Sequence, residues 1–388
     1  MSDPLGDPVS HLAGGPMTGL ERLAAKGPAN GAANGPADRP ANEPAGLLEL
    51  RDVSVTYRGA TGDVPAVRGV SLALDAGEAL GVAGESGSGK STLAMSLLRL
   101  LPRDARVSGR ILLEGEDVLG MNWGRLRAVR WASASVVFQG AQHALNPVRR
   151  IGDQIAEPLL VHGTATRAEA GRRTAELLEQ VGLPAWRARG HPHELSGGQR
   201  QRVMIAMALA CSPRLIIADE PTTALDVMIQ AQVLMLIRSL VAEHGIGLMM
   251  ISHDLSVLAS TCDQLAIMYA GRVVESGPAR QVFRAAAHPY GRALAEAFPT
   301  VGDPSSRRAP RGLGGDPPDP ARLPPGCSFH PRCPVPLLSC ASEPIELRPV
   351  TARAPGGARD GRTVDDATPA GRARPHVAAC VHVGEEAR

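Results

Sequence analysis

The chain has 388 residues, enough for about two domains. Hydrophobic residues make up 44% and aromatic residues only 3%, so a sizeable core would be built from aliphatic side chains. The net charge of +2, without a basic stripe, argues against nucleic-acid binding. No run approaches the roughly 18 apolar residues of a membrane span, and the first residues show no secretion signal, so we expect a cytoplasmic protein.

Residues 1–46 are rich in Ala, Gly, Pro and Asn and predict a disordered tail. Beyond them, alternating or continuous apolar runs predict strands. The predicted strands span, in chain order, residues 48–57, 70–74, 79–83, 215–218 and 247–251. Helical patterns lie between strands, including residues 91–101, and this alternation predicts a parallel α/β sheet. Ligands of such sheets bind beyond the carboxyl ends of the strands, where the polar motifs described below fall.

Three further segments follow from composition. Residues 140–212 predict mostly helices, interrupted at Gly and Pro. Residues 300–325 are rich in Pro, Gly and Arg and predict a linker. Residues 326–388 show little regular pattern but carry four of the six cysteines. In a reducing compartment these cysteines favour metal binding or buried thiols over disulfides.

A glycine-rich loop follows the predicted strand 79–83. The loop and the start of the next helix consist of Gly84, Glu85, Ser86, Gly87, Ser88, Gly89, Lys90, Ser91 and Thr92. The segment fits G-x-x-x-x-G-K-[ST] at every fixed position, with a strand before it and a helix after it. Backbone N–H groups of such a loop surround phosphate oxygens, while Lys90 would reach the β- and γ-phosphates and the Ser91 hydroxyl would bind Mg²⁺. The loop therefore predicts ATP binding.

The lysine count supports a chemical role for Lys90. Of 41 basic residues only Lys26 and Lys90 are lysines, and Lys26 lies in the predicted tail. A planar, bulky guanidinium cannot replace a compact ammonium inside a phosphate cradle. We therefore interpret Lys90 as retained for phosphate binding.

Two acids follow the predicted strand 215–218. Asp219 at the strand end can hold Mg²⁺, and Glu220 can polarise the attacking water as a general base. Adjacent acids at a strand end are also common as a helix N-cap pair. The phosphate loop upstream favours the catalytic interpretation.

Leu195-Ser196-Gly197-Gly198-Gln199 resembles the signature of ATP-binding cassette (ABC) ATPases. Four other positions match motifs of this family: Tyr57 the aromatic that stacks on adenine, Gln139 the Q-loop, Ala224-Leu225-Asp226 the D-loop and His253 the switch histidine. The resemblance covers residues 47–299. It implies a P-loop NTPase α/β fold: a RecA-like parallel sheet core, an antiparallel β subdomain and an α-helical subdomain at about 140–212.

The resemblance also implies a mechanism in which two such domains face each other head to tail. ATP bound to one domain would be closed over in trans by the partner's Ser196, Gly197, Gly198, Gln199 and Asp226. Glu220 would be the base, His253 would contact the γ-phosphate, and Gln139 would ligate Mg²⁺ with Ser91 and Asp219. Each match taken alone has another interpretation: Tyr57 could be a strand-packing aromatic, His253 a helix cap and Gln139 a turn residue.

Two stretches narrow the branch of the family. Residues 145–158 resemble a stretch of peptide-importer ATPases, and His288-Pro289-Tyr290 resembles the element that opens the extension of oligopeptide and dipeptide permease ATPases. Residues 198–209 and 221–227 look more like the first (D-type) than the second (F-type) ATPase of such systems. The resemblance implies an F-type partner ATPase, two transmembrane permease subunits and, indirectly, an extracytoplasmic solute-binding protein. It also implies a peripheral position on the cytoplasmic face of the inner membrane.

The second constellation is made of Cys327, Cys333, Cys340 and Cys380. Their spacing fits neither two C-x₂-C knuckles nor the commonest ferredoxin run, so spacing leaves zinc and iron–sulfur open. The resemblance favours a [4Fe-4S] cluster in a C-terminal extension. His330, His376 and His382 could ligate instead, and Cys211 and Cys262 in apolar helical contexts predict buried thiols.

We therefore expect an ATPase subunit of a di- or oligopeptide importer, with nickel or another small solute as alternative cargo. Two other classes stay open: a soluble ABC ATPase of DNA repair or translation, and a metal- or redox-sensing regulator. Translation types carry two cassettes and repair types a long coiled-coil insertion, and this chain has neither feature.

Overall fold

The structure, a computed structural model, describes residues 46–59, 62–140, 144–223, 225–297, 313–350 and 374–383. These residues belong to one structural unit. The predicted tail up to residue 45 and the first half of the predicted linker lie outside the described residues. The described residues 313–350 and 374–383 are called the C-terminal segment below.

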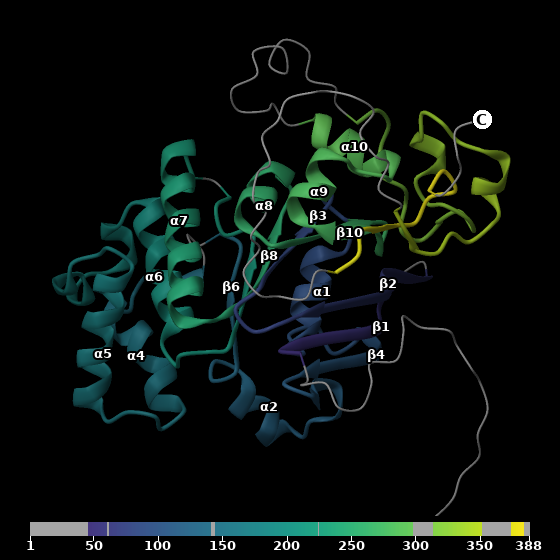
Figure 1. The fold of residues 1–388 in the computed structure, drawn as a ribbon. Coiled ribbons are helices and arrows are strands. Elements are labelled where there is room, and N and C mark those ends of the chain that lie inside the picture. Colours follow the sequence, from purple (N-terminus) through teal and green to yellow (C-terminus); the bar gives the residue numbers. More distant parts are fainter. Residues whose placement is uncertain are drawn as a thin grey trace, which may run out of the picture. The chain divides into compact units, whose positions relative to one another are not determined.

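An eight-stranded sheet forms the centre of the fold (Figure 1). Its strands are β3 (Ala79–Ala83), β6 (Ala134–Val137), β7 (Leu215–Asp219), β8 (Gly247–Ser252), β9 (Gln264–Tyr269), β10 (Arg272–Pro278), β11 (Arg348–Pro349) and β12 (Val377–Ala378). They lie in the order β11-β12-β10-β9-β3-β8-β7-β6. The strands from β9 to β6 are parallel, as predicted, and β10, β12 and β11 continue the sheet antiparallel.

The strands β11 and β12 were not predicted from sequence. They are only two residues long and come from the C-terminal segment, whose local pattern is irregular. β12 binds the edge of β10, a strand far away in sequence, and β11 then pairs with β12.

A four-stranded antiparallel sheet in the order β2-β1-β4-β5 forms a second layer. Its strands are β1 (Leu48–Gly59), β2 (Gly62–Leu74), β4 (Arg106–Leu113) and β5 (Glu116–Asp117). The predicted strand 70–74 is only the end of β2. The earlier part of β2 contains Gly and Pro, which conceal a strand pattern, yet it pairs with β1.

The helices lie between and around these strands. They are α1 (Lys90–Ser96), α2 (Trp123–Val129), α4 (Ile151–Val161), α5 (Arg167–Gln180), α6 (Gly197–Leu209), α7 (Val227–His244), α8 (Leu255–Thr261), α9 (Ala279–Arg284) and α10 (Pro289–Glu296). Short 3₁₀ turns lie at η1 (Val118–Gly120), η2 (Ala185–Arg189), η3 (Pro192–Glu194), η4 (His330–Arg332) and η5 (Leu338–Ala341). The predicted helix 91–101 was too long: α1 ends at Ser96, and Arg99 has a φ of 51°, which a helix interior does not allow.

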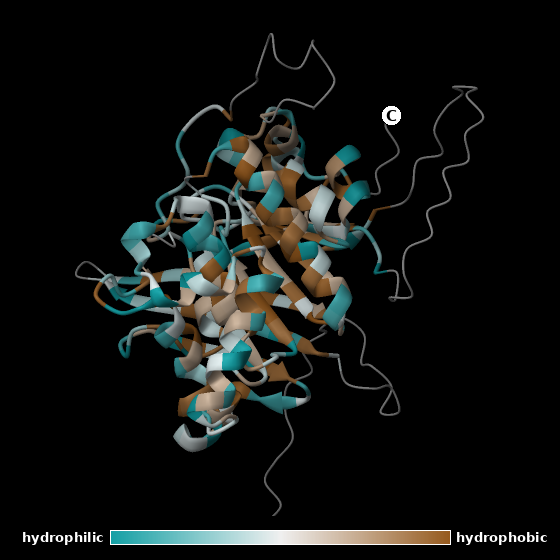
Figure 2. Cartoon of the chain, turned by 90° about the vertical axis from the view of Figure 1, so that its left-hand side faces the viewer, coloured by the Kyte–Doolittle hydropathy of each residue, from teal (hydrophilic) through white to brown (hydrophobic). Residues whose placement is uncertain are grey.

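The hydrophobic core lies on both faces of the large sheet (Figure 2). Successive strand residues point to opposite faces, so Leu248 and Met250 join one cluster and Met249 and Ile251 the other. The first cluster includes apolar residues of helices α4 to α10. The second includes residues of α1, α2 and the four-stranded sheet. The carboxyl ends of the buried strands are thereby held in a fixed frame.

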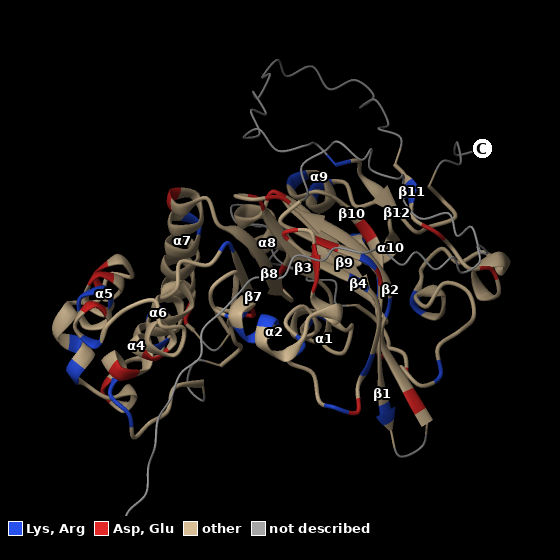
Figure 3. Ribbon diagram, turned by 90° about the horizontal axis from the view of Figure 1, so that it is seen from below, with Lys and Arg blue, Asp and Glu red and all other residues tan. Residues whose placement is uncertain are grey.

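The helices α4, α5 and α6 pack on one another, and together they carry both acidic and basic residues (Figure 3). Two ion pairs lie here, Arg149 with Glu157 at 2.6 Å and Arg173 with Glu176 at 3.2 Å. In the part of the chain that the structure describes, no helix is both long and apolar enough to cross a membrane.

Candidate active site

The glycine-rich loop connects β3 to α1 at the carboxyl end of the parallel strands. Two of its glycines are required by geometry. Gly84 has a φ of 152°, and a Cβ there would lie 2.3 Å from the carbonyl oxygen of Met268. Gly89 caps α1 with a φ of 100°, and a Cβ there would lie 2.2 Å from the carbonyl oxygen of Ala66. A side chain at either position would displace backbone, so the loop conformation requires glycine.

Lys90 is buried beneath the loop. Its Nζ donates hydrogen bonds to the carbonyl oxygens of Gly84 and Glu85, each at 2.8 Å, and to Ser88 Oγ at 3.2 Å. Burial lowers the pKa of Lys90, while the carboxylates of Glu220, Asp219 and Glu85 act to raise it. The ammonium is thus held at the loop by neutral acceptors, which phosphate oxygens can replace as stronger partners.

Ser91 in α1 and Asp219 at the end of β7 lie next to each other. Ser91 Oγ donates to Asp219 Oδ1 at 3.2 Å. Burial raises the pKa of Asp219, the hydrogen bond from Ser91 lowers it, and the nearby Glu220 carboxylate raises it further. The two oxygens form a hard donor pair of the kind that Mg²⁺ prefers.

Glu220 lies at the centre of the predicted catalytic residues. Its Oε2 accepts hydrogen bonds from Gln139 Nε2 at 3.0 Å and from Thr223 Oγ1 at 2.8 Å, and its Oε1 lies 3.3 Å from His253 Nδ1. The backbone of Glu220 has a φ of 45°, an uncommon value for a residue with a side chain. Strain of this kind is held in place by its surroundings, here by the hydrogen bond from Glu220 N to the carbonyl oxygen of Ile251 at 2.9 Å.

These contacts bring together all three residues predicted to act in catalysis, from three loops that follow β6, β7 and β8. Tyr57 comes from β1 in the other sheet, and its Oη lies 3.2 Å from Thr92 Oγ1. Its stacking on adenine stays a prediction.

The signature residues start helix α6, with Gly197 as its first residue. Ser196 Oγ accepts from Gln199 N at 3.3 Å, and Gln199 Oε1 accepts from Ser196 N at 3.1 Å, which makes a capping box. Gly198 packs on α7, where a Cβ would lie 2.4 Å from Ile229 Cγ2. No hydrogen bond or ion pair among the described residues joins the signature to the phosphate loop of the same chain.

The predicted D-loop leads into α7. Asp226 caps this helix by accepting a hydrogen bond from Ile229 N at 3.0 Å. Ala224, the first residue of the predicted motif, lies outside the described residues.

Comparison with known proteins identifies the family. Residues 67–223 match the family described as ABC transporter, and residues 274–340 match the family described as oligopeptide/dipeptide transporter, C-terminal region. The oligopeptide transport ATP-binding protein OppD of Salmonella typhimurium is 44% identical over 315 residues, which are 81% of this chain and 92% of that protein. This chain belongs to the ABC transporter family, in its oligopeptide/dipeptide branch.

Further relatives agree with this assignment. OppD of Escherichia coli is 44% identical over 300 residues, 77% of this chain and 88% of that protein. The ATP-binding cassette MJ0796 is 29% identical, and its structure matches with a TM-score of 0.54 over 60% of this chain and 99% of that one. It was solved as a dimer in a post-hydrolysis state with ADP and Pi. CbiO1 of Clostridium perfringens is 28% identical with a TM-score of 0.53, covering 62% and 91%. The predicted ABC nucleotide-binding fold is confirmed.

Sequence reasoning missed three residues that contact the predicted site of the cassette. Thr223 bonds Glu220 from three residues away, a short spacing that could have suggested it. Tyr290 Oη accepts a hydrogen bond from Glu85 N at 2.8 Å, and Arg332 pairs with the Glu85 carboxylate at 2.7 Å. These last two residues lie 205 and 247 positions from Glu85, so no local signal indicates them.

The four cysteines of the C-terminal segment are free thiols. Burial raises the pKa of Cys327, Cys333 and Cys380, and Cys340 acts on all three. The pKa of Cys380 is also raised by Cys327 and Cys333, so the four sulfurs lie within electrostatic range of one another. As arranged, however, the described residues contain no group of three or more His, Cys, Asp or Glu side chains that could hold a metal ion. The cluster prediction is therefore not supported by the geometry.

Proposed function

We propose that this protein hydrolyses ATP to drive the import of di- or oligopeptides through membrane-embedded partner subunits. The observation that carries the proposal is the group of residues around Glu220. Gln139 and His253 both contact the Glu220 carboxylate, which lies beside the phosphate loop. The family and the printed names of its relatives, oligopeptide transport ATP-binding proteins, support peptides as the cargo.

In this proposal the loop from Gly84 to Thr92 holds the triphosphate through its backbone N–H groups, with the helix dipole of α1 behind it. Lys90 exchanges its carbonyl partners for the β- and γ-phosphate oxygens. Tyr57 stacks on the adenine from the other sheet. The donor set of Ser91, Gln139 and Asp219 suits Mg²⁺, which when bound neutralises charge on the phosphates.

Glu220 accepts a proton from the attacking water in the proposed mechanism. Gln139 and Thr223 fix one carboxylate oxygen by hydrogen bonds, so the carboxylate keeps one orientation during the reaction. His253 lies on the other oxygen, is more than half exposed, and can reach the γ-phosphate side of the site. A general base in this position contributes about 10²- to 10⁴-fold to the rate.

The exchange Glu220→Gln tests this role. We expect ATP turnover to fall by about 10²- to 10⁴-fold, because the amide cannot accept the proton, while ATP affinity stays within about threefold. Glu243→Gln, the same exchange at an exposed position of α7, is the matched control. Turnover of the Glu220→Gln protein within about tenfold of the unmodified protein would remove Glu220 as the base.

We further propose that the site is completed in trans by a second cassette. The signature from Ser196 to Gln199 and Asp226 would then face the phosphate loop of the partner, with the start of α6 directed at the γ-phosphate. Support comes from the dimeric relative MJ0796, and no hydrogen bond or ion pair among the described residues ties the signature to its own phosphate loop. A D-type assignment implies an F-type partner and a heterodimer.

The importer proposal also requires two permease subunits and a peripheral position at the cytoplasmic face of the membrane, with the solute-binding protein acting indirectly. Affinity capture of the full chain from detergent-solubilised membranes tests it. We expect two integral membrane subunits and a second ATPase in the captured complex. Protein found only in the soluble fraction, without permease subunits, would instead favour a soluble ATPase or a regulator.

We propose the division into a tail (1–46), a cassette (47–299), a linker (300–325) and a cysteine-bearing extension (326–388). The extension carries four thiols, the number of ligands that a [4Fe-4S] cluster takes, and the proposal needs them to come closer together than they lie among the described residues. Iron analysis and ultraviolet–visible spectra of anaerobically purified protein decide this. About four iron atoms per chain support the cluster, whereas one zinc or no metal contradicts it.

A further inference from the structure

The C-terminal segment reaches the phosphate loop through one side chain. Arg332 Nη1 and Nη2 donate to the two carboxylate oxygens of Glu85 at 2.7 and 3.0 Å, a two-pronged ion pair. Arg332 Nη1 also donates to Tyr269 Oη at 3.2 Å, and Arg332 Nε donates to the carbonyl oxygen of Gly314 at 2.9 Å. All three nitrogens of the guanidinium are therefore bonded, and the Arg332 side chain is only 7% exposed.

The neighbouring Phe329 anchors this contact. It is 2% exposed, and its ring lies 5.3 Å from the rings of both Tyr269 and Tyr290. Tyr290 Oη in turn accepts a hydrogen bond from the backbone N–H of Glu85. Both the backbone and the side chain of Glu85 are thus held by residues outside the phosphate loop, and one of those residues belongs to the C-terminal segment.

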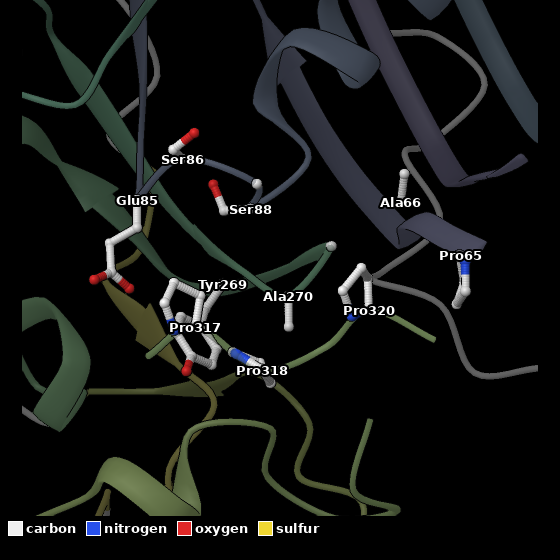
Figure 4. A pocket seen from close by; sticks show the side chains of 12 residues that line it. Pro65, Ala66, Glu85, Ser86, Ser88, Tyr269, Ala270, Pro317, Pro318 and Pro320 are labelled. Carbon is white, nitrogen blue, oxygen red and sulfur yellow. The ribbon is translucent and has the colours of Figure 1, made fainter. Parts of the chain in front are cut away.

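The same segment lines a pocket at the loop. Its lining includes Pro317, Pro318 and Pro320 of the C-terminal segment together with Glu85, Ser86, Ser88 and Tyr269 (Figure 4). The C-terminal segment therefore borders the loop at this pocket as well as bonding Glu85 through the ion pair.

The charge of Glu85 explains why this pairing bears on ATP. Glu85 is close enough to Lys90 to act on its pKa together with Asp219 and Glu220. An unpaired carboxylate at this place would repel a triphosphate bound to Lys90. With both oxygens bonded to a guanidinium, the charge of Glu85 is balanced and its carboxylate is turned to Arg332.

We propose that Arg332 is a positioning residue for ATP, which neutralises Glu85 and fixes the phosphate loop from the C-terminal segment. It acts through Glu85 and does not need to touch the nucleotide. The inference rests on the proposed binding of ATP at this loop. It makes Arg332 of the C-terminal segment part of the nucleotide site, so changes that break its pair with Glu85 alter ATP affinity.

The test measures the dissociation constant of Mg-ATP by calorimetry on the full chain, with Glu220→Gln present throughout to prevent turnover. We expect Arg332→Ala to raise the dissociation constant by about three- to tenfold, because an unpaired carboxylate then faces the phosphates. Adding Glu85→Gln to Arg332→Ala should restore it to within about twofold, since the repelling charge is gone. Arg322→Ala, an exposed arginine of the same segment, should leave it unchanged.

Two results would overturn the proposal. One is an Mg-ATP affinity that stays unchanged in folded Arg332→Ala. The other is a loss of Mg-ATP affinity in Arg332→Ala that the added Glu85→Gln exchange does not restore, which is expected if Arg332 only anchors the C-terminal segment. If Arg332→Ala does not fold, Glu85→Gln alone decides: affinity equal to or tighter than that of the parent supports the proposal, and weaker affinity refutes it. Lys90→Ala tests the proposed ATP site separately from the role of Arg332. ATP binding that survives this exchange contradicts the proposed site itself.

Discussion

Glu275 joins three parts of the chain at one buried carboxylate. The side chain is fully buried in β10 and accepts hydrogen bonds from Ala287 N at 2.6 Å, His288 N at 3.0 Å and His376 Nε2 at 2.7 Å. The first two donors lie immediately before α10, with His288 as its N-cap, and His376 belongs to the C-terminal segment. We predict that Glu275→Gln is strongly destabilising although it keeps the shape of the side chain.

The magnitude follows from the donors. An amide offers one acceptor oxygen, and its NH₂ group must then face at least one of the three donors. Each buried donor left without a partner costs about 1–3 kcal/mol. We therefore expect Glu275→Gln to lower the free energy of unfolding by about 1–3 kcal/mol, and Glu275→Ala, which leaves all three donors without a partner, by more.

Urea unfolding of the full chain, followed by circular dichroism, measures this loss. The matched control is Glu116→Gln, which removes the carboxylate from an exposed pair with Arg125 at 2.7 Å. Water screens exposed pairs, so the control should differ little from the parent. A loss below about 1 kcal/mol in Glu275→Gln would refute the reasoning, because it would mean that the three donors find other partners.

Two further predictions concern the loop and pH. Gly84→Ala should abolish ATP binding, because its Cβ would lie 2.3 Å from the carbonyl oxygen of Met268 at a φ of 152°. Titration with ATP checks this, and Gly171→Ala, an exchange in α5 with open space around it, should bind normally. Burial lowers the pKa of His288 to about 4, with Arg292 adding to the effect. Below pH 6.5 the imidazole of His288 is therefore protonated in the unfolded chain but stays neutral in the folded chain. The free energy of unfolding should then fall as the pH falls from 6.5 towards about 4, by on the order of 3 kcal/mol. Melting temperatures across this range should show a shallower slope for His288→Asn, which keeps the helix cap; an equally steep slope contradicts the assignment.

The local parts of the site could be predicted from sequence. The phosphate loop needs glycines with special backbone angles, a lysine and a hydroxyl at fixed spacing, and a short stretch of sequence contains them all. Buried parallel strands are recognisable as continuous apolar runs, so β3, β7 and β8 were predicted close to their true bounds. Because the carboxyl ends of such strands share one edge of the sheet, the meeting of Gln139, Glu220 and His253 also followed from their places after strands.

The C-terminal segment could not be predicted in this way. Its strands are too short to show a period, and β12 exists because β10 offers an edge. Arg374 bonds Asp75 and Glu78 at 3.1 Å, beside the start of β3, and His376 reaches Glu275. The sequence indicated four cysteines and a possible metal, but it said nothing about where that segment would lie.

The sequence by itself thus determined the family, the fold of the cassette and the chemistry of the phosphate loop, since these depend on residue types at fixed short spacings. Only the tertiary structure decided that Arg332 pairs with Glu85 and that Glu275 and His376 join buried partners. The physical reason is that such contacts join residues far apart in the chain. Their partners are selected by the packing of whole elements, and no local pattern of residues records that packing.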